Sequence, residues 1–246
     1  TKHEDAHTEL LKSFIPAANW RDVAGQSAQE ISRQIQEDRI CILIDLSNHG
    51  ADNRLDVMAL RPAPLQFTYA GVLNTTGLRA IDFSITDAIA DPSDTQQQFS
   101  EDLVRLPGCF LCYTPPANIP PVSWNSSSRS CITFGSFSTL AKISAPCVTL
   151  WAEILQRVPD SKLLVKNHGF LSAEVSAKFV EKFEVHGIGS DRLLLHGFSS
   201  RFETLELYNE VDIALDTLPY SNVTTTCEAL LMGVPTISLS GETRVS

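Results

Sequence analysis

Short apolar runs alternate with amphipathic segments along most of the chain. Ile40–Leu46 (ICILIDL) is a continuous apolar run that predicts a buried strand, and Leu65–Tyr69 and Ile81–Ile85 predict two more. Before them, apolar positions at Ile31 and Ile35 form one stripe and predict a helix. Because strands of this kind are usually joined by helices in a parallel sheet, we expect an α/β fold.

This alternation is interrupted once, at residues 114–130, which are rich in proline and serine and predict a linker or a surface loop. Beyond it, strands are predicted at 131–134, 162–166, 193–195, 211–215 and 236–239, and helices at 144–157, 172–185, 201–209 and 226–232. We therefore predict a partial N-terminal lobe at 1–113 and a partial C-terminal lobe at 131–246. Two Rossmann-like domains facing one another across a cleft are expected, with ligands at the carboxyl ends of the strands.

Composition excludes several classes of protein. The 246 residues are 43% hydrophobic, which is enough for real cores, and the net charge of −10 argues against a nucleic-acid partner. No apolar run is long enough to span a membrane, so no membrane partner is expected. Six cysteines scattered through apolar runs predict reduced, mostly buried thiols and a cytoplasmic or nuclear location. Cys109 and Cys112 have metal-ligand spacing, but without a second pair we interpret them as packing residues and expect no metal.

Three consecutive threonines, Thr224–Thr226, stand where the helix at 226–232 begins. A helix N-terminus presents free N–H groups and the positive end of the helix dipole, and hydroxyls add further donors. This pattern is typical of an anion site. In the simpler alternative, one threonine caps the helix and the others only favour the preceding loop.

Several stretches in one order resemble the catalytic region of the O-linked N-acetylglucosamine transferases and their SPINDLY-type relatives. Among them are DLSNHGADN (45–53), ALRPAP (59–64) and TTTCEAL (224–230). The resemblance implies a GT-B fold and inverting, metal-independent transfer of N-acetylglucosamine from UDP-GlcNAc to Ser or Thr of proteins, with tetratricopeptide repeats upstream and no cofactor. Two alternatives stay open: fucose transfer from GDP-fucose, and an inactive truncated scaffold.

The resemblance also implies roles for residues of the C-terminal lobe. Lys142 matches a lysine that neutralises the donor diphosphate, and Thr224–Thr226 match the loop and helix end that bind it. Glu228 matches an acidic ribose ligand, and Arg201 a basic contact to the ribose or base. Simpler interpretations are an exposed lysine for Lys142 and a first-turn helix carboxylate for Glu228.

In the N-terminal lobe, the resemblance implies that Gly71 and the loop Thr75, Thr76 and Gly77 approach the sugar and the acceptor. Asp82 matches a former candidate for the catalytic base, although we favour a strand carboxylate that holds a loop by hydrogen bonds. His49 could serve as a base because its intrinsic pKa is near neutral, or it could be an ordinary loop histidine.

The chain departs from the family pattern at four places. The loop after Gly71 reads VLNTTG in place of an aromatic residue, a proline and a glycine. Ser138 stands where an amide is common, Thr204 where a histidine is usual, and Val223 where a histidine or threonine is usual. These changes predict weaker donor binding or a different nucleotide sugar. Opening strands of the first lobe and closing helices of the second are also expected beyond the residues of this chain.

Overall fold

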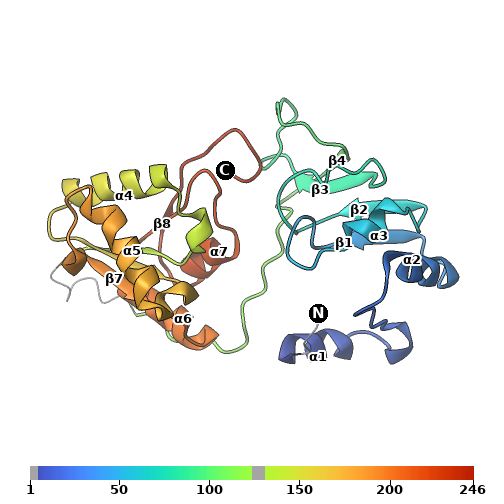
Figure 1. The fold of residues 1–246 in the computed structure, drawn as a ribbon, viewed down its shortest axis with the longest axis horizontal. Helices are drawn as coiled ribbons and strands as arrows, with labels where there is room; N and C mark the ends of the chain where they lie inside the picture. Colours follow the sequence, from blue (N-terminus) through green and yellow to red (C-terminus); the bar gives the residue numbers. More distant parts are fainter. Residues whose placement is uncertain (1–4, 124–130) are drawn as a thin grey trace. The chain divides into compact units, whose positions relative to one another are not determined.

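The computed structural model describes residues 5–123 and 131–246, which form two compact units, Thr1–Leu111 and Cys112–Ser246 (Figure 1). The described part of the Pro/Ser-rich segment belongs to the second unit. There, the Asn209 side chain accepts a hydrogen bond from the Ser123 N–H at 2.8 Å and donates one to the Pro121 carbonyl at 3.1 Å. The remainder of that segment, 124–130, lies outside the described residues. How the two lobes face one another stays a prediction.

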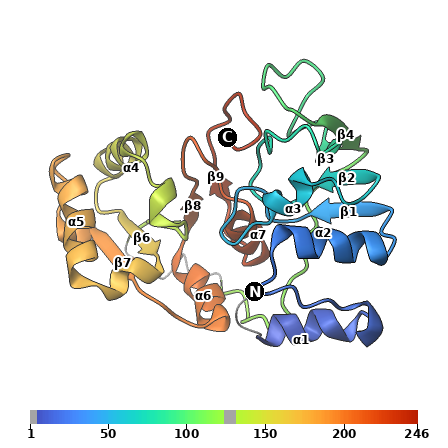
Figure 2. The same ribbon diagram turned by 45° about the vertical axis from the view of Figure 1, so that its right-hand side comes forward.

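The first unit contains a four-stranded parallel sheet in the order β1-β2-β3-β4. Its elements are α1 (Ala6–Ser13), a 3₁₀ turn (Ala17–Asn19), α2 (Ala28–Glu37), β1 (Ile42–Asp45), α3 (Leu55–Ala59), β2 (Leu65–Thr68), β3 (Phe83–Asp87) and β4 (Asp102–Leu106). Figures 1 and 2 show α2 and α3 beside β1 and β2. The connections after β2 and β3 contain no helix, so these strands are not joined by helices in the way that is usual for parallel sheets. Long loops replace them at the carboxyl end of the sheet.

Of two local sequence signals near the start of this unit, the structure bears out one and contradicts the other. Ser27 and Glu30 form a reciprocal capping box at the start of α2, and in its apolar stripe Ile31 is buried and Ile35 is half-buried. In contrast, β1 is not the buried strand that its apolar run predicts, because Ile42 and Ile44 are 54% and 47% exposed. β1 is the edge of the sheet, and one of its faces is uncovered among the described residues.

The second unit contains a five-stranded parallel sheet in the order β7-β6-β5-β8-β9, the strand order of a doubly wound fold. Its strands are β5 (Thr133–Ser136), β6 (Lys162–Lys166), β7 (Leu193–His196), β8 (Ile213–Leu215) and β9 (Thr236–Ile237), and its helices are α4 (Ala145–Arg157), α5 (Ala173–Glu184), α6 (Arg201–Leu207) and α7 (Thr224–Leu231). Short 3₁₀ turns lie at Leu140–Lys142, His168–Leu171, Ser190–Arg192 and Tyr208–Glu210. Figure 2 shows helices on both sides of this sheet.

Two apolar clusters hold the second sheet between its helices. Trp151 of α4 and Phe183 of α5 pack with Leu163 of β6, while Tyr208 and Met232 belong to a separate cluster. Chain order reverses between β5 and β8, so their carboxyl ends meet at a topological switch point. In open parallel sheets this is where ligands bind. The predicted α/β class is confirmed.

Several sequence predictions need correction. The helix predicted at 226–232 begins two residues earlier, so Thr224–Thr226 form its first turn. Of the six cysteines, Cys41, Cys109 and Cys112 are exposed and only Cys147 is fully buried, so the prediction of mostly buried thiols is wrong. No helix among the described residues has the length and apolar character needed to cross a membrane.

Candidate functional site

The first turn of α7 is not capped by a side chain. Val223 occupies the N-cap position without a side-chain hydrogen bond, and the first helical bond runs from the Cys227 N–H to its carbonyl. The Thr226 hydroxyl donates backwards to the Asn222 carbonyl at 3.3 Å. The alternative in which one threonine caps the helix is therefore wrong. The N–H groups of Thr224–Thr226 come before the first helical hydrogen bond, so they are available to an anion.

Lys142 ends the 3₁₀ turn after β5 and reaches the loop that leads into α7. Its Nζ donates to the Ser221 carbonyl at 3.0 Å and lies 4.3 Å from the centre of the Tyr220 ring. Burial lowers the pKa of this half-buried ammonium, and the charge of Asp216 partly opposes that shift. Lys142 forms no ion pair with any residue that the structure describes. Its partial burial and its contacts to Ser221 and Tyr220 argue against the simple exposed-lysine interpretation.

The loop between β8 and α7 is held by side chains from three strand ends. Asp216, directly after β8, accepts from the N–H groups of Thr217 and Asn222, each at 2.8 Å, and from the Ser238 hydroxyl at 2.7 Å. The Asn222 amide donates to the Ser138 hydroxyl at 2.5 Å. A small crevice at the switch point is lined by residues that include Ser136, Asp216, Asn222, Thr225 and Thr226. The chain thus fixes the first turn of α7 against the carboxyl ends of β5 and β8.

Glu228 lies one turn into α7 and is largely buried. Its Oε1 is 3.5 Å from the Arg201 guanidinium at the start of α6. Burial raises the pKa of Glu228, while the positive charges of Arg201 and Lys166 lower it. Tyr208 links the two helices, because its hydroxyl donates to the Thr225 carbonyl at 3.0 Å. The structure therefore brings Arg201 and Glu228 together, as an ion pair beside the first turn of α7.

In the first unit, Gly71 packs directly on the turn after β1. A Cβ at Gly71 would lie 2.7 Å from the Ser47 carbonyl carbon and 2.9 Å from the Asn48 nitrogen, so only glycine fits. The Asn48 amide donates to the Asn74 carbonyl at 2.8 Å, and the His49 Nε2 lies 3.2 Å from the Thr75 carbonyl oxygen. The loops after β1 and β2 are thus interlocked.

The Thr75–Gly77 turn is held from its other side by Glu101. The Thr75 hydroxyl and the Thr76 N–H each donate to the Glu101 carboxylate at 2.7 Å, and the Thr76 hydroxyl donates to it as well. Gly77 follows in the left-handed region, with φ +73°. The structure brings His49, Gly71, Thr75, Thr76 and Gly77 into one cluster of loops.

Asp82 lies apart from that cluster. Its carboxylate accepts from the Arg61 guanidinium at 2.7 Å and from the Gln66 N–H at 2.9 Å. Burial raises the pKa of Asp82, but the hydrogen bonds from Arg61 and Gln66 outweigh it and the net shift is downward. A carboxylate with a lowered pKa and two donors is a poor base, so these contacts favour the structural interpretation.

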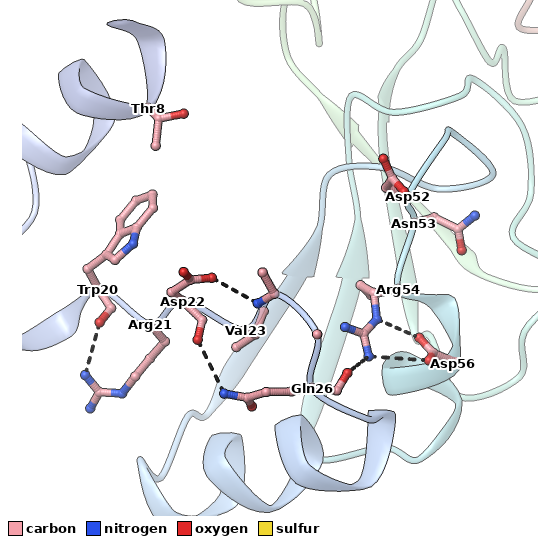
Figure 3. Close-up of a pocket in the computed structure, with 12 residues that line it drawn as sticks. Thr8, Trp20, Arg21, Asp22, Val23, Gln26, Asp52, Asn53, Arg54 and Asp56 are labelled. Atoms are coloured by element: carbon pink, nitrogen blue, oxygen red, sulfur yellow. Dashed lines mark hydrogen bonds and ion pairs between the residues drawn. The ribbon is translucent and has the colours of Figure 1, made fainter. Parts of the chain in front are cut away.

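A larger cavity of about 500 Å³ lies elsewhere in the first unit, between residues 20–26 and 52–56 (Figure 3). Its charged groups are mostly paired: Arg54 binds Asp56 at 3.1 Å and donates to the Gln26 carbonyl at 3.3 Å. None of the candidate site residues lines this cavity, although Asp52 and Asn53 of the DLSNHGADN stretch do. Its size alone does not make it the reactive site.

Comparison with known proteins identifies the family. A family model described as glycosyl transferase family 41 matches residues 14–114 and 126–246. A protein of Eustoma exaltatum subsp. russellianum named "Probable UDP-N-acetylglucosamine--peptide N-acetylglucosaminyltransferase SPINDLY" is 46% identical over 241 residues, 96% of this chain and 26% of that protein. The chain belongs to glycosyl transferase family 41.

Two further comparisons also match N-acetylglucosaminyltransferases. The SEC protein of Arabidopsis thaliana, described with the same activity, is 30% identical over 91% of this chain and 23% of its own length. A lysine variant of the O-GlcNAc transferase of Thermobaculum terrenum has a TM-score of 0.93 and 36% identity, over 99% of this chain and 46% of that one. The GT-B class implied by the resemblance is confirmed. The chain spans about a quarter of the length of the curated family 41 relatives it matches.

Sequence reasoning missed several residues that shape this candidate site. Asp216 and Asn222 organise the loop before α7, and Glu101 holds the Thr75–Gly77 turn. Asn222 also supplies an amide beside Ser138, the position where the sequence lacks one. The strand-end position of Asp216 was the one local signal available, because the other contacts join residues far apart in sequence.

Proposed function

We propose that this chain binds UDP-N-acetylglucosamine in its second unit and takes part in its transfer to Ser or Thr hydroxyls of proteins. The observation that carries the proposal is the uncapped first turn of α7, Thr224–Thr226, beside the Lys142 loop, where no described carboxylate pairs with the ammonium. The names of the relatives, which all specify UDP-N-acetylglucosamine and a peptide, support the same donor and acceptor. They do not favour the GDP-fucose alternative.

The proposed chemistry is a single displacement. The acceptor hydroxyl oxygen attacks the anomeric carbon as the bond to the diphosphate breaks, the hydroxyl proton passes to a general base, and the electron pair of the broken bond leaves with UDP. Negative charge grows on the leaving diphosphate, so fixed donors aimed at it stabilise the transition state more than the ground state. Lys142 and the N–H groups and hydroxyls of Thr224–Thr226 are assigned this role.

Nucleotide recognition would use the neighbouring pair. In this proposal Glu228 accepts hydrogen bonds from ribose hydroxyls, and Arg201, which is 3.5 Å from it, orients that carboxylate and contacts the nucleotide. Because Lys142 and α7 supply the positive charge in this proposal, removing divalent metal with EDTA should leave UDP affinity unchanged.

Calorimetric titration of UDP into wild type and Lys142→Ala tests the site. Loss of a charge-assisted contact should weaken UDP binding at least about tenfold. Lys178→Ala is the matched control, because Lys178 is an exposed lysine on α5 whose ion pair among the described residues is with Glu174, at 2.6 Å. Equal UDP affinity in wild type and Lys142→Ala would contradict the assignment, and tighter binding of GDP than UDP would restore the fucosyl alternative.

Mass spectrometry of a Ser/Thr acceptor peptide after incubation with UDP-GlcNAc tests the transfer. A peptide heavier by one N-acetylglucosamine residue supports transfer and eliminates the inactive-scaffold alternative. A chain that binds UDP normally yet leaves the peptide unmodified would limit the proposal to donor binding.

A further inference from the structure

Glu101 is a buried carboxylate, 4% exposed, that forms no ion pair with any described residue. Its partners are three neutral donors on the Thr75–Gly77 turn: the Thr75 hydroxyl, the Thr76 N–H and the Thr76 hydroxyl. The Ser100 N–H also donates to the Thr75 hydroxyl oxygen, at 3.0 Å. Burial raises the pKa of Glu101, but the hydrogen bonds from Thr76 and Thr75 outweigh it and the net shift is downward, so the charged carboxylate and the turn stabilise one another.

The Thr75–Gly77 turn also contacts the ring of His49. A carbonyl oxygen can only accept, so the 3.2 Å contact between the Thr75 carbonyl and Nε2 requires the proton on Nε2. In the neutral ring, Nδ1 then carries the lone pair. Asn48, 1% exposed, fixes the backbone on both sides of this contact: its amide donates to the Asn74 carbonyl, and its side-chain oxygen accepts from the His49 N–H at 2.7 Å.

We propose that Glu101 is a positioning residue: by holding Thr75 and Thr76 it fixes the Thr75 carbonyl, which keeps His49 in the Nε2–H tautomer with Nδ1 as proton acceptor. The role of Nδ1 rests on the proposed function. In that step the acceptor O–H gives its proton to Nδ1, its oxygen bonds to the anomeric carbon, and the bond to UDP breaks with its electrons on the diphosphate.

Glutamate suits this position better than glutamine. Three donors converge on its two oxygens, and a carboxylate offers only acceptors. In Glu101→Gln, one oxygen becomes an NH₂ group that must face an N–H or hydroxyl donor of the same turn. The side-chain volume is unchanged, so the variant loosens the turn without leaving a cavity. Thr76→Val removes the hydroxyl that donates to the Glu101 carboxylate and serves as a second variant.

Long-range ¹H–¹⁵N correlation spectra of the histidine rings test the positioning directly. The His49 signal, assigned by its loss in His49→Gln, should show the Nε2–H tautomer in wild type and a mixture of tautomers in Glu101→Gln and Thr76→Val. Glu30→Gln is the control, because Glu30 also accepts a backbone N–H and a hydroxyl, at 2.8 and 2.7 Å, but caps α2. A wild-type Nδ1–H tautomer, or a variant spectrum identical to wild type, would overturn the proposal.

Kinetics separates this role from general stability. In Glu101→Gln, kcat for peptide glycosylation should fall roughly tenfold or more because a reacting group is misplaced, while KM for UDP-GlcNAc and UDP affinity stay unchanged. Equal kcat in wild type and Glu101→Gln would overturn the proposal. If wild type transfers no sugar but the His49 tautomer still depends on Glu101, the proposed function fails and the positioning stands.

Discussion

At the scale of single residues, the threonine hydroxyls of α7 are the most informative groups. If Thr225 and Thr226 bind a diphosphate, replacing both with valine removes hydrogen bonds to a charged group, each worth roughly 1.5–3 kcal/mol. We expect Thr225→Val/Thr226→Val to bind UDP at least about tenfold more weakly. Uridine, which lacks phosphates, should bind the variant and wild type equally in calorimetric titrations.

A matched variant separates this effect from altered helix stability. Thr149 is an exposed threonine of α4 whose hydroxyl donates to the Ala145 carbonyl at 3.2 Å, so Thr149→Val makes the same chemical change away from the site. It should leave UDP affinity unaltered. Equal losses of uridine and UDP affinity in the Thr225→Val/Thr226→Val variant would show that this helix end contacts the nucleoside.

Glu228 gives a prediction about how the stability of the fold depends on pH. Burial raises the pKa of Glu228 in the folded chain, so the folded state binds more protons than the unfolded state between the two pKa values. Stability from this group is present below the unfolded pKa and is lost as pH rises through the folded pKa. Glu228→Gln should therefore unfold at higher urea concentration than wild type at about pH 8, with a smaller difference at about pH 4.

The same Glu228→Gln variant should bind both uridine and UDP more weakly, by a similar factor of roughly ten, because both contain the ribose. Glu203→Gln is a suitable control, since Glu203 is an exposed first-turn glutamate of α6. A variant less stable than wild type at high pH would contradict the burial argument, and unaltered uridine binding would contradict the ribose assignment.

These residues differ in how far sequence could predict them. The threonine cluster and Lys142 stand next to elements that local patterns predict, so their place at the end of a strand or helix follows from the sequence. Glu101 could not be found this way, because it binds Thr76, which is 25 residues away. The Asn222–Ser138 bond spans 84 residues and is equally invisible to local reasoning.

At the scale of elements, the sequence predicts the second sheet better than the first. All five strands of the second sheet were expected, because each is an apolar run bounded by a turn or a helix signal. In the first sheet β4 (Asp102–Leu106) was missed, since acidic and basic residues break its apolar pattern. The exposure of Ile42 and Ile44 was also missed, because an apolar run does not reveal whether both faces of its strand are covered.

Helix α5 offers a test of the packing that supports the second sheet. The Phe183 side chain is fully buried and its ring centre is 5.3 Å from that of Phe179, within the cluster that includes Leu163. Phe183→Ala should lower the free energy of unfolding by about 3–5 kcal/mol, measured by urea denaturation. Val185, 80% exposed just beyond α5, is the control, and Val185→Ala should change stability by less than about 0.5 kcal/mol. Similar effects from both variants would contradict the assigned core.

At the scale of the whole molecule, each unit has its own sheet and its own buried residues. The apolar clusters around Trp151 and around Tyr208 contain only residues of the second unit, and Val57, Met58 and Ile81 are buried in the first. Separate cores allow separate unfolding, so a single free energy of unfolding need not describe the chain. A ligand stabilises only the unit that binds it.

This separation predicts a selective response to UDP. The groups assigned to the nucleotide, Lys142, Arg201, Thr224–Thr226 and Glu228, all belong to the second unit. UDP at about 100 times its Kd should stabilise that unit by about 2.7 kcal/mol, or roughly 5–10 °C in its thermal midpoint. Hydrogen exchange followed by mass spectrometry should then slow in peptides from 112–246 and stay unchanged in peptides from 1–111. The Thr225→Val/Thr226→Val variant should lose most of this protection at the same UDP concentration, whereas slower exchange in both units would show that the first unit shares in nucleotide binding.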